Sequence, residues 1–263
     1  MGVHGGKRMN ILREQLKEGR LLFGTVVSLS DPAICEIVGN AGYDCVWIDT
    51  EHTYLSPKEV LCHLNAARAV GLSALVRVPQ NDLTATKRIL EMGPDGILFP
   101  MVRSYQEFQE LLSMTLYPPL GTRGFGPMRA VGYRPERSDA YVNGGGQLSL
   151  CRFFQIEAVS MIDELDRIAA SPYVDGFLLG PNDLSGSVGE MLNVLGERTA
   201  AAMRRACEIA RRNGKRIGVA CGGDAATLSF FRDLGVDMIF AGGDWQMLAG
   251  AAADTAARLN ALR

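Results

Sequence analysis

The sequence predicts a single-domain (β/α)8 barrel. Two observations lead to this fold: eight short apolar runs recur along the chain, and a helix-like amphipathic segment follows each of them. The length of 263 residues is close to the usual size of one such barrel. Repeated strand–helix units with short connections are typical of a parallel sheet, and eight units favour closure into a barrel over an open doubly wound sheet.

The apolar runs are hydrophobic on both faces, which is the pattern of strands buried on both sides of a parallel arrangement. They begin at Leu21, Tyr43, Leu72, Asp95, Leu148, Val174, Lys215 and Val236.

Helix-start and helix-stop residues mark the segments between the runs. Asp31-Pro32 and Ser56-Pro57 each offer a cap followed by proline at the first helical position. Asp82 caps a helix that ends at Gly93. Further helices are expected over 104–114, 160–171, 197–214, 225–235 and 244–263.

One stretch, residues 117–147, interrupts this rhythm because it is rich in glycine, proline and arginine. Connections this long inside a compact domain are usually functional, so we expect a loop on the active face. Elsewhere no linker is visible. The expected organisation is a leader with a first helix over 1–20 and a barrel over 21–263.

Composition excludes several classes of function. A net charge of −2, with scattered basic residues, gives no bulk attraction to nucleic acid or to anionic membranes. No apolar stretch reaches the length of a membrane span, and the N-terminus lacks the apolar region of a signal peptide. The six cysteines form no C-x-x-C pair. These features predict a cytoplasmic enzyme with reduced cysteines and neither nucleic-acid nor membrane partners.

Candidate site residues follow the ends of the predicted strands, where barrel enzymes carry their catalytic groups. Closure of the barrel would bring them around one pocket although they are far apart in sequence. They are Asp49, Thr50, Glu51 and His52 after the second run, Arg77 after the third, Pro100-Met101 after the fourth, Gln155 and Glu157 after the fifth, Gly180 to Asp183 after the sixth, and Gly242 to Asp244 after the eighth.

Two of these carboxylates, Glu157 and Asp183, suit a divalent cation. With oxygens from water and substrate, they would make the oxygen-rich site that Mg²⁺ or Mn²⁺ prefers. Each carboxylate alone could equally be an exposed helix cap. Their positions on adjacent strand ends favour a metal site.

His52 is one of three histidines and directly follows two acids that can hydrogen-bond its ring. A surface histidine entering a loop is the alternative, but its position at a strand end favours a general base. Asp49 is the expected partner, provided that the strand end bends back.

Arg77 lies in an otherwise buried run, so its guanidinium needs an anionic partner. Asp49 or Glu91 could form that ion pair, and the same arginine could hold a substrate oxygen. The turn Gly180-Pro181-Asn182 would expose the amides of Asn182 and Asp183 to a substrate carboxylate, although a plain tight turn is the alternative.

None of the five lysines ends a predicted strand; Lys215 begins one, at the opposite face of the barrel. A Schiff-base aldolase requires a lysine inside the pocket. Stabilisation of a carbanion would therefore fall to a metal.

The motifs DTEH (49–52), VRVP (76–79), YPPLGTRGFG (117–126), QIE (155–157) and GPNDLS (180–185) together resemble the HpcH/HpaI aldolase family, the class II pyruvate aldolases. The resemblance runs from about Leu21 to the last helix. It implies a (β/α)8 barrel, a trimer or hexamer with an exchanged final helix, and Mg²⁺, Mn²⁺ or Co²⁺ on Glu157 and Asp183. It implies His52 with Asp49 as the base dyad, Arg77 as the enolate-stabilising arginine and Glu91 as an acid near that site.

The resemblance implies cleavage of a 4-hydroxy-2-oxo acid to pyruvate and an aldehyde, with oxaloacetate decarboxylation as a side activity. We expect Gln155 and the 180–183 turn to bind the substrate. Thr50 departs from the glycine that close aldolases often carry, and the 117–147 segment has its own sequence, so the second substrate stays open. Two alternatives remain: a lyase acting on a CoA thioester or another 2-oxo acid in a related barrel, and a non-catalytic barrel for small-acid sensing or assembly.

Overall fold

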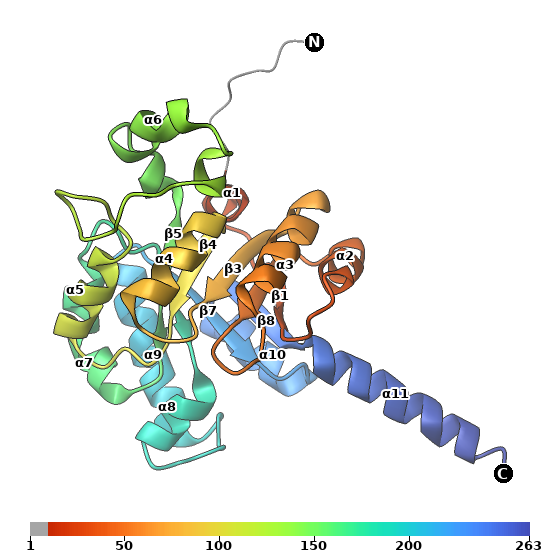
Figure 1. Cartoon of the computed structure of the whole chain (residues 1–263). Helices are drawn as coiled ribbons and strands as arrows, with labels where there is room; N and C mark the ends of the chain where they lie inside the picture. Colours follow the sequence, from red (N-terminus) through yellow and green to blue (C-terminus); the bar gives the residue numbers. More distant parts are fainter. Residues whose placement is uncertain (1–9) are drawn as a thin grey trace.

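The computed structural model describes residues 10–263 and forms a closed barrel of eight parallel strands in the order β1 to β8 (Figure 1). All eight predicted strands are present. They are β1 Leu22–Val27, β2 Cys45–Asp49, β3 Ser73–Arg77, β4 Gly96–Phe99, β5 Cys151–Ile156, β6 Gly176–Leu179, β7 Arg216–Cys221 and β8 Met238–Gly243. The prediction of a (β/α)8 barrel is therefore confirmed.

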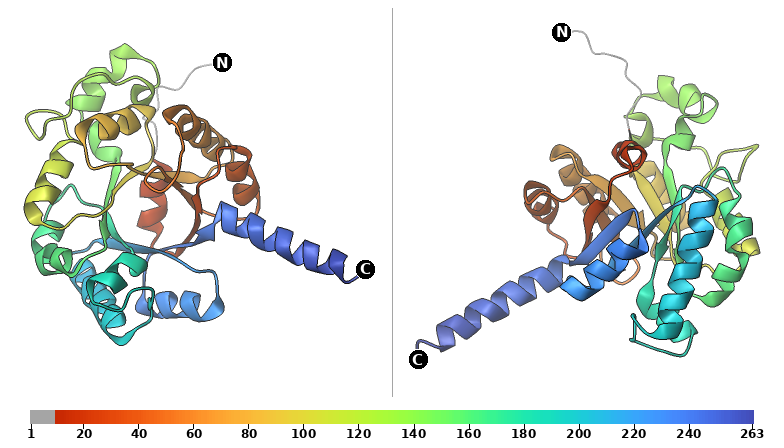
Figure 2. Two further views of the ribbon diagram at one scale, coloured as in Figure 1. Left: turned by 60° about the horizontal axis from the view of Figure 1, so that its bottom comes forward. Right: turned by 180° about the vertical axis from the view of Figure 1, so that it is seen from behind.

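Within residues 10–263 the chain forms helices α1 to α11, and most of them surround the barrel on its outer side (Figure 2). They are α1 Ile11–Glu18, α2 Ala33–Asn40, α3 Pro57–Ala69, α4 Leu83–Met92, α5 Tyr105–Ser113, α6 Ser138–Val142, α7 Val159–Ala169, α8 Pro181–Ser187, α9 Glu197–Arg212, α10 Ala225–Leu234 and α11 Asp244–Asn260, with short 3-10 turns at Arg129–Val131, Pro135–Arg137 and Gly146–Ser149. No helix within residues 10–263 is both long and apolar enough to cross a membrane.

The caps expected from the sequence are formed at two helices, α3 and α4. Ser56 and Glu59 make a reciprocal capping box at α3, and Asp82 accepts the N–H of Ala85 at α4. Gly93 ends α4 in the left-handed conformation with φ 63°. At α2 the cap differs, because Asp31 accepts the N–H of Ala33 while the helix itself starts at Ala33. Capping residues close in sequence thus determine where these helices begin and end.

Two separate apolar clusters fill the fold. The larger lies between the strands and the outer helices. The smaller fills the interior of the barrel, where Leu12 and Leu16 of α1 pack with Trp47, Phe153 and Phe240 from the strands. Successive residues of a strand point alternately into and out of the barrel, so Trp47 and Asp49 share the inner face of β2.

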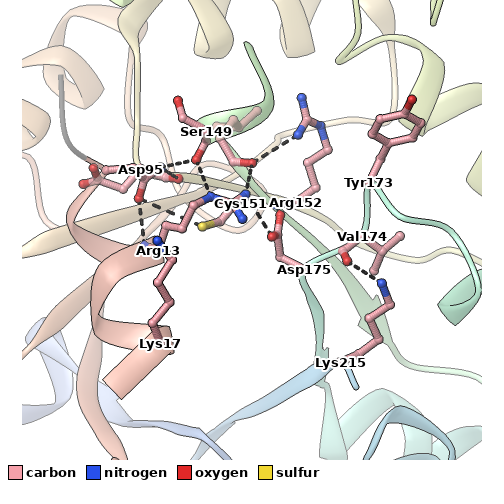
Figure 3. Close-up of polar contacts among 12 residues, drawn as sticks. Arg13, Lys17, Asp95, Ser149, Cys151, Arg152, Tyr173, Val174, Asp175 and Lys215 are labelled. Carbon is pink, nitrogen blue, oxygen red and sulfur yellow. Dashed lines mark hydrogen bonds and ion pairs between the residues drawn. The ribbon is translucent and has the colours of Figure 1, made fainter. Parts of the chain in front are cut away.

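Helix α1 packs against the amino ends of the strands with Leu12 and Leu16, and Figure 3 shows the polar contacts of Arg13 on this helix. Arg13 donates from Nε to the carbonyl of Ser149 at 2.9 Å and pairs through Nη2 with Asp175 at 2.9 Å. Asn10 donates to the carbonyl of Asp95 at 2.6 Å. The first helix, expected to belong to a leader, thus packs on the barrel, while residues 1–9 of that leader lie outside the described residues. The opposite, carboxyl end of the strands is where barrel enzymes carry their sites.

The segment 117–147 lies at the amino end of the barrel, so its expected place on the active face is wrong. It follows α5 and leads into β5, and such a helix-to-strand connection returns to the amino ends of the strands. Arg152, at the start of β5, ties its two ends together: it donates to the carbonyl of Gln147 at 3.0 Å and to the hydroxyl of Thr115, just before the segment, at 2.7 Å. The sequence revealed the length of the connection, but its irregular composition was a poor guide to which end it occupies.

Helix α11 projects away from the barrel (Figures 1 and 2). Every residue from Trp245 to the C-terminus is exposed in the isolated chain. The outer faces of β8 and β1 are left with an open apolar groove that includes Phe23, Tyr43, Leu228 and Ile239.

Candidate active site

The site is built around an ion pair between neighbouring strands. Asp49 on β2 and Arg77 on β3 are paired residues at the carboxyl ends of their strands. Arg77 donates from Nε to Oδ1 of Asp49 at 2.9 Å and from Nη2 to Oδ2 at 2.7 Å. This two-point contact fixes the plane of the guanidinium. Both residues are buried, with 4% and 6% of their surfaces exposed.

The charge of Arg77 keeps Asp49 ionised. Burial on its own raises the pKa of Asp49, but the hydrogen bonds and the charge of Arg77 outweigh it and hold that pKa below its ordinary value. Of the two partners considered for Arg77, Asp49 is the one that the structure provides. A deprotonated Asp49 leaves Arg77 as a fixed cation at the mouth of the barrel.

His52 lies at the rim, and the acid nearest its ring is Glu51. The Nε2 atom of His52 is 3.7 Å from Oε2 of Glu51, and 68% of its side chain is exposed. Both Asp49 oxygens already accept from Arg77, and Oδ1 also accepts the N–H of Glu51. The expected His52–Asp49 contact is therefore not formed within this chain.

Glu51 joins the rim to the ion pair. Its carboxylate lies 3.0 Å from Nη1 of Arg77. Burial raises the pKa of Glu51, although Arg77 and His52 partly offset that effect. Glu51 was visible in the sequence beside His52, but only the turn of the chain after β2 shows that it reaches both neighbours.

Glu157 follows β5 and is buried, with 5% exposed. Burial raises the pKa of its carboxyl to about 7, and the nearby negative charges of Asp183 and Glu51 act in the same direction. The carboxylate accepts the backbone N–H of Met101 at 2.6 Å. Met101 holds φ 55°, a left-handed conformation that is uncommon outside glycine and that aims this amide at Glu157.

Gly180 sets the space beside Glu157. A Cβ at this position would stand 2.6 Å from Cγ of Glu157 and 3.1 Å from Nε2 of Gln155. Gln155 is also buried, and its Oε1 lies 3.4 Å from Nη1 of Arg77. The absence of a side chain at Gly180 is what lets both polar groups take their places at the mouth.

The turn after β6 becomes a short helix. Gly180 precedes α8, which starts at Pro181 and carries Asn182 and Asp183 in its first turn. Both side chains are exposed, and Asp183 lies near enough to affect the pKa of Glu157 and Glu51. The structure therefore brings Asp183 to the same mouth as Glu157.

The structure does not bring Glu91 to this site. It lies near the amino end of the barrel, because α4 runs antiparallel to the strands. Its Oε1 accepts from Nη2 of Arg123 at 2.9 Å, and Arg123 stacks on Tyr117 in the 117–147 segment. The contact of Glu91 with Arg77 that was considered, and the position near that site that the resemblance implies, are not formed within this chain.

Trp47 was not a candidate from the sequence, and Met101 was named only as the end of the fourth run without a role. Met101 acts through its backbone amide, which no side-chain pattern reveals. Trp47 did carry a signal, because it precedes Asp49 by two residues and so must share its inner face. Its ring lies under Arg77, with the guanidinium carbon 4.8 Å from the ring centre.

Comparison with known proteins gives a consistent relationship over nearly the whole chain. The chain is 32% identical over 250 residues to a hydroxypyruvate/pyruvate aldolase of Roseovarius nubinhibens, covering 95% of this chain and 96% of the relative. It is 32% identical over 252 residues to a 4-hydroxy-2-oxo-heptane-1,7-dioate aldolase of Shigella sonnei, covering 96% and 95%.

A solved structure of an HpcH/HpaI aldolase/citrate lyase family protein from Burkholderia cenocepacia superposes with a TM-score of 0.87 at 28% identity, covering 96% of this chain and all of that one. The profile of the HpcH/HpaI aldolase/citrate lyase family matches residues 22–250. The chain therefore belongs to this family of carbon–carbon lyases.

Proposed function

We propose that this protein cleaves a 4-hydroxy-2-oxo acid reversibly to pyruvate and an aldehyde with the help of a divalent cation. The observation that carries the proposal is the crowding of Glu157, Asp183 and Glu51 beside the fixed cation Arg77. The names of the relatives, hydroxypyruvate/pyruvate aldolase and 4-hydroxy-2-oxo-heptane-1,7-dioate aldolase, support this substrate class.

The carboxylates fit a divalent cation such as Mg²⁺, Mn²⁺ or Co²⁺. A buried Glu157 whose carboxyl is crowded by other negative charges is stabilised when a cation neutralises them. Among residues 10–263 no three His, Cys, Asp or Glu side chains gather as a complete ligand set. Glu157 and Asp183 would therefore hold the ion together with oxygens from outside the protein, as hard cations accept. When bound, the cation supplies Lewis acidity that stabilises negative charge on the 2-oxo group.

Arg77 supports the same charge from the protein side. Asp49 orients the guanidinium of Arg77, so its N–H donors are already in place when a 2-oxo acid binds. A donor held in position before the reaction costs little reorganisation as negative charge grows on the keto oxygen. Gln155, in contact with Arg77, would fix the carboxylate end of the substrate.

His52 would accept the proton of the 4-hydroxyl in the cleavage direction. As that proton leaves, the C4–O bond becomes a carbonyl, the C3–C4 bond breaks and its electrons form the pyruvate enolate. Protonation of C3 then gives pyruvate, and the aldehyde departs. Glu51, 3.7 Å from the ring, would stabilise the protonated imidazole. Decarboxylation of oxaloacetate passes through the same enolate without a hydroxyl proton, so we expect it as a side activity.

We also propose that the protein assembles as a trimer or hexamer in which α11 packs on a neighbour. Two observations support this: α11 exposes Leu248 and Leu259 to solvent, and an apolar groove lies open on the outer face of β8 and β1. In the other strand–helix units, the following helix covers this outer face. A helix from a second copy would bury both surfaces at once.

A screen for pyruvate release over a set of 4-hydroxy-2-oxo acids, with and without EDTA, tests the proposed activity. Release that EDTA stops and added Mg²⁺ restores is the expected result. Undiminished release in EDTA would reject the role of the metal, and no release from any member of the set would reject the substrate class.

A further inference from the structure

Trp47 lies directly beneath the ion pair in the interior of the barrel. The ring is 2% exposed, and the guanidinium carbon of Arg77 is 4.8 Å from its centre. This is within the range at which a cation is attracted to an aromatic face, and tryptophan offers the strongest such face. The contact is shielded from water, which strengthens it.

The ring has little freedom to turn. Phe240 on β8 meets it edge-on, with ring centres 5.6 Å apart and planes at 88°. Phe240 in turn fills the space above Gly24, where a Cβ would stand 2.6 Å from the Phe240 ring. The Trp47 ring is thus held in a fixed orientation beneath the guanidinium.

The N–H donors of Arg77 are distributed among several partners. Asp49 takes the Nε edge and one N–H of Nη2, while Nη1 faces Gln155 at 3.4 Å and Glu51 at 3.0 Å. Within residues 10–263 Nη2 donates to Asp49 alone, so its second N–H is left for another acceptor. A substrate oxygen can be met by that N–H only if the guanidinium keeps its plane, which the two-point contact with Asp49 sets and which the Trp47 ring beneath it would help to maintain.

We propose that Trp47 is a positioning residue for Arg77, and that its indole reports occupation of the site by a 2-oxo acid. This rests on the proposed function. The indole N–H supplies a second observation, because Nε1 is buried and has no hydrogen-bond partner within residues 10–263. The inner cluster around it is apolar and offers that N–H no acceptor.

The test separates the ring face from the N–H group and from general packing. Trp47→Phe keeps an aromatic face and removes the N–H, whereas Trp47→Leu removes both. Phe153→Leu is the matched control, because Phe153 is buried in the same inner cluster and makes no cation–π contact with Arg77 within the described residues. We expect Trp47→Leu to lower kcat/KM for oxaloacetate decarboxylation about tenfold, which corresponds to ~1.4 kcal/mol. Trp47→Phe should lose about threefold or less, and Phe153→Leu should lower the melting temperature without this kinetic loss.

A binding signal provides a readout that does not depend on turnover. Trp47 and Trp245 are the two tryptophans, and Trp245 lies exposed on α11. In a Trp245→Phe protein loaded with Mg²⁺, we expect pyruvate to change the emission of Trp47 in a saturable way. Arg77→Ala should weaken that titration strongly.

Three results would overturn the proposal: wild-type kcat/KM in Trp47→Leu, an equal loss in Trp47→Phe and Trp47→Leu, or an emission that saturating pyruvate leaves unchanged. If the unsubstituted enzyme released no pyruvate from any 4-hydroxy-2-oxo acid, the proposed function would fail separately. The pyruvate titration would still decide the role of Trp47 in that case.

Discussion

Asp49 and Arg77 stand opposite each other on β2 and β3 and are joined by two hydrogen bonds of 2.9 and 2.7 Å. The pair occupies the inner layer of the barrel at the point where the strands end. The carboxylate of Asp49 balances the buried positive charge of Arg77, so the site holds a fixed guanidinium although no lysine of residues 10–263 lies there. The pairing also makes Asp49 a residue on which both stability and activity depend.

Asp49→Asn should destabilise the protein because it leaves a buried guanidinium without its carboxylate. Removal of one partner of a buried pair typically costs about 3–5 kcal/mol in the free energy of unfolding. Asp166→Asn is the control, because it removes the partner of Arg212 from an exposed pair whose attraction is screened by water, and it should cost far less stability. Urea unfolding of both variants measures the difference, and equal losses would show that the Asp49–Arg77 pair carries no special weight.

Glu157→Ala and Asp183→Ala should each abolish the binding of a divalent cation while the barrel stays folded. Each variant removes one of two charged ligands at the mouth, far from the interior cluster that supports the fold. Calorimetric titration with Mn²⁺ measures the affinity, and circular dichroism checks the fold. Asp163→Ala, at an exposed position on α7, is the control and should bind like the wild type. Undiminished affinity in both site variants would show that Glu157 and Asp183 are not the metal ligands.

Gly180→Ala should weaken cation binding without removing a ligand. The added Cβ would stand 2.6 Å from Cγ of Glu157, so the carboxylate must move. Gly126→Ala adds a Cβ with nothing within 4 Å and should leave binding unchanged. Titration of both variants gives the comparison, and a Gly180→Ala protein with normal affinity would show that Glu157 can shift at no cost.

Leu248→Arg on α11 and Leu228→Arg in the β8–β1 groove should each reduce the assembly to smaller species. Either change places a charge on one of the two surfaces that we propose to meet. Leu83→Arg, at another exposed apolar position, should leave the mass unchanged. Light scattering at micromolar protein measures the mass, which we expect to be a multiple of three chains in the wild type. A monomeric wild type would contradict the proposed exchange of α11.

Much of this architecture could be predicted from the sequence because burial on both faces leaves a clear pattern. The runs beginning at Leu21 and Tyr43 became β1 and β2, and alternation along β2 already places Trp47 and Asp49 on one face. Residues at strand ends, including Arg77 and Glu157, could be assigned to one mouth from topology alone.

The features that could not be predicted depend on the direction in which a helix runs and on which of two side chains pairs with a given carboxylate. Asp49 was expected to serve His52, but Arg77 occupies both of its oxygens, and sequence spacing cannot rank two competing partners. Glu91 falls at the amino end of the barrel because of the direction of α4. Whether α11 packs on its own barrel or leaves it depends on tertiary contacts, since its apolar pattern fits either outcome.

The assignment of proton transfer to His52 and of enolate stabilisation to Arg77 is the centre of the proposed mechanism. Substitution of each residue should therefore lower the rates on two substrates to different extents. Oxaloacetate decarboxylation has no 4-hydroxyl proton to remove, whereas aldol cleavage does, and both reactions pass through the enolate. Loss of a positioned base typically costs about 10²–10⁴ in rate.

The most direct test is kcat/KM of His52→Ala and Arg77→Ala on oxaloacetate and on a 4-hydroxy-2-oxo acid. We expect His52→Ala to lose aldol cleavage by about 10²–10⁴ while largely keeping oxaloacetate decarboxylation, and Arg77→Ala to lose both. If His52→Ala lost both reactions equally, His52 would not be the base for the 4-hydroxyl, and the proposed division of roles would be wrong.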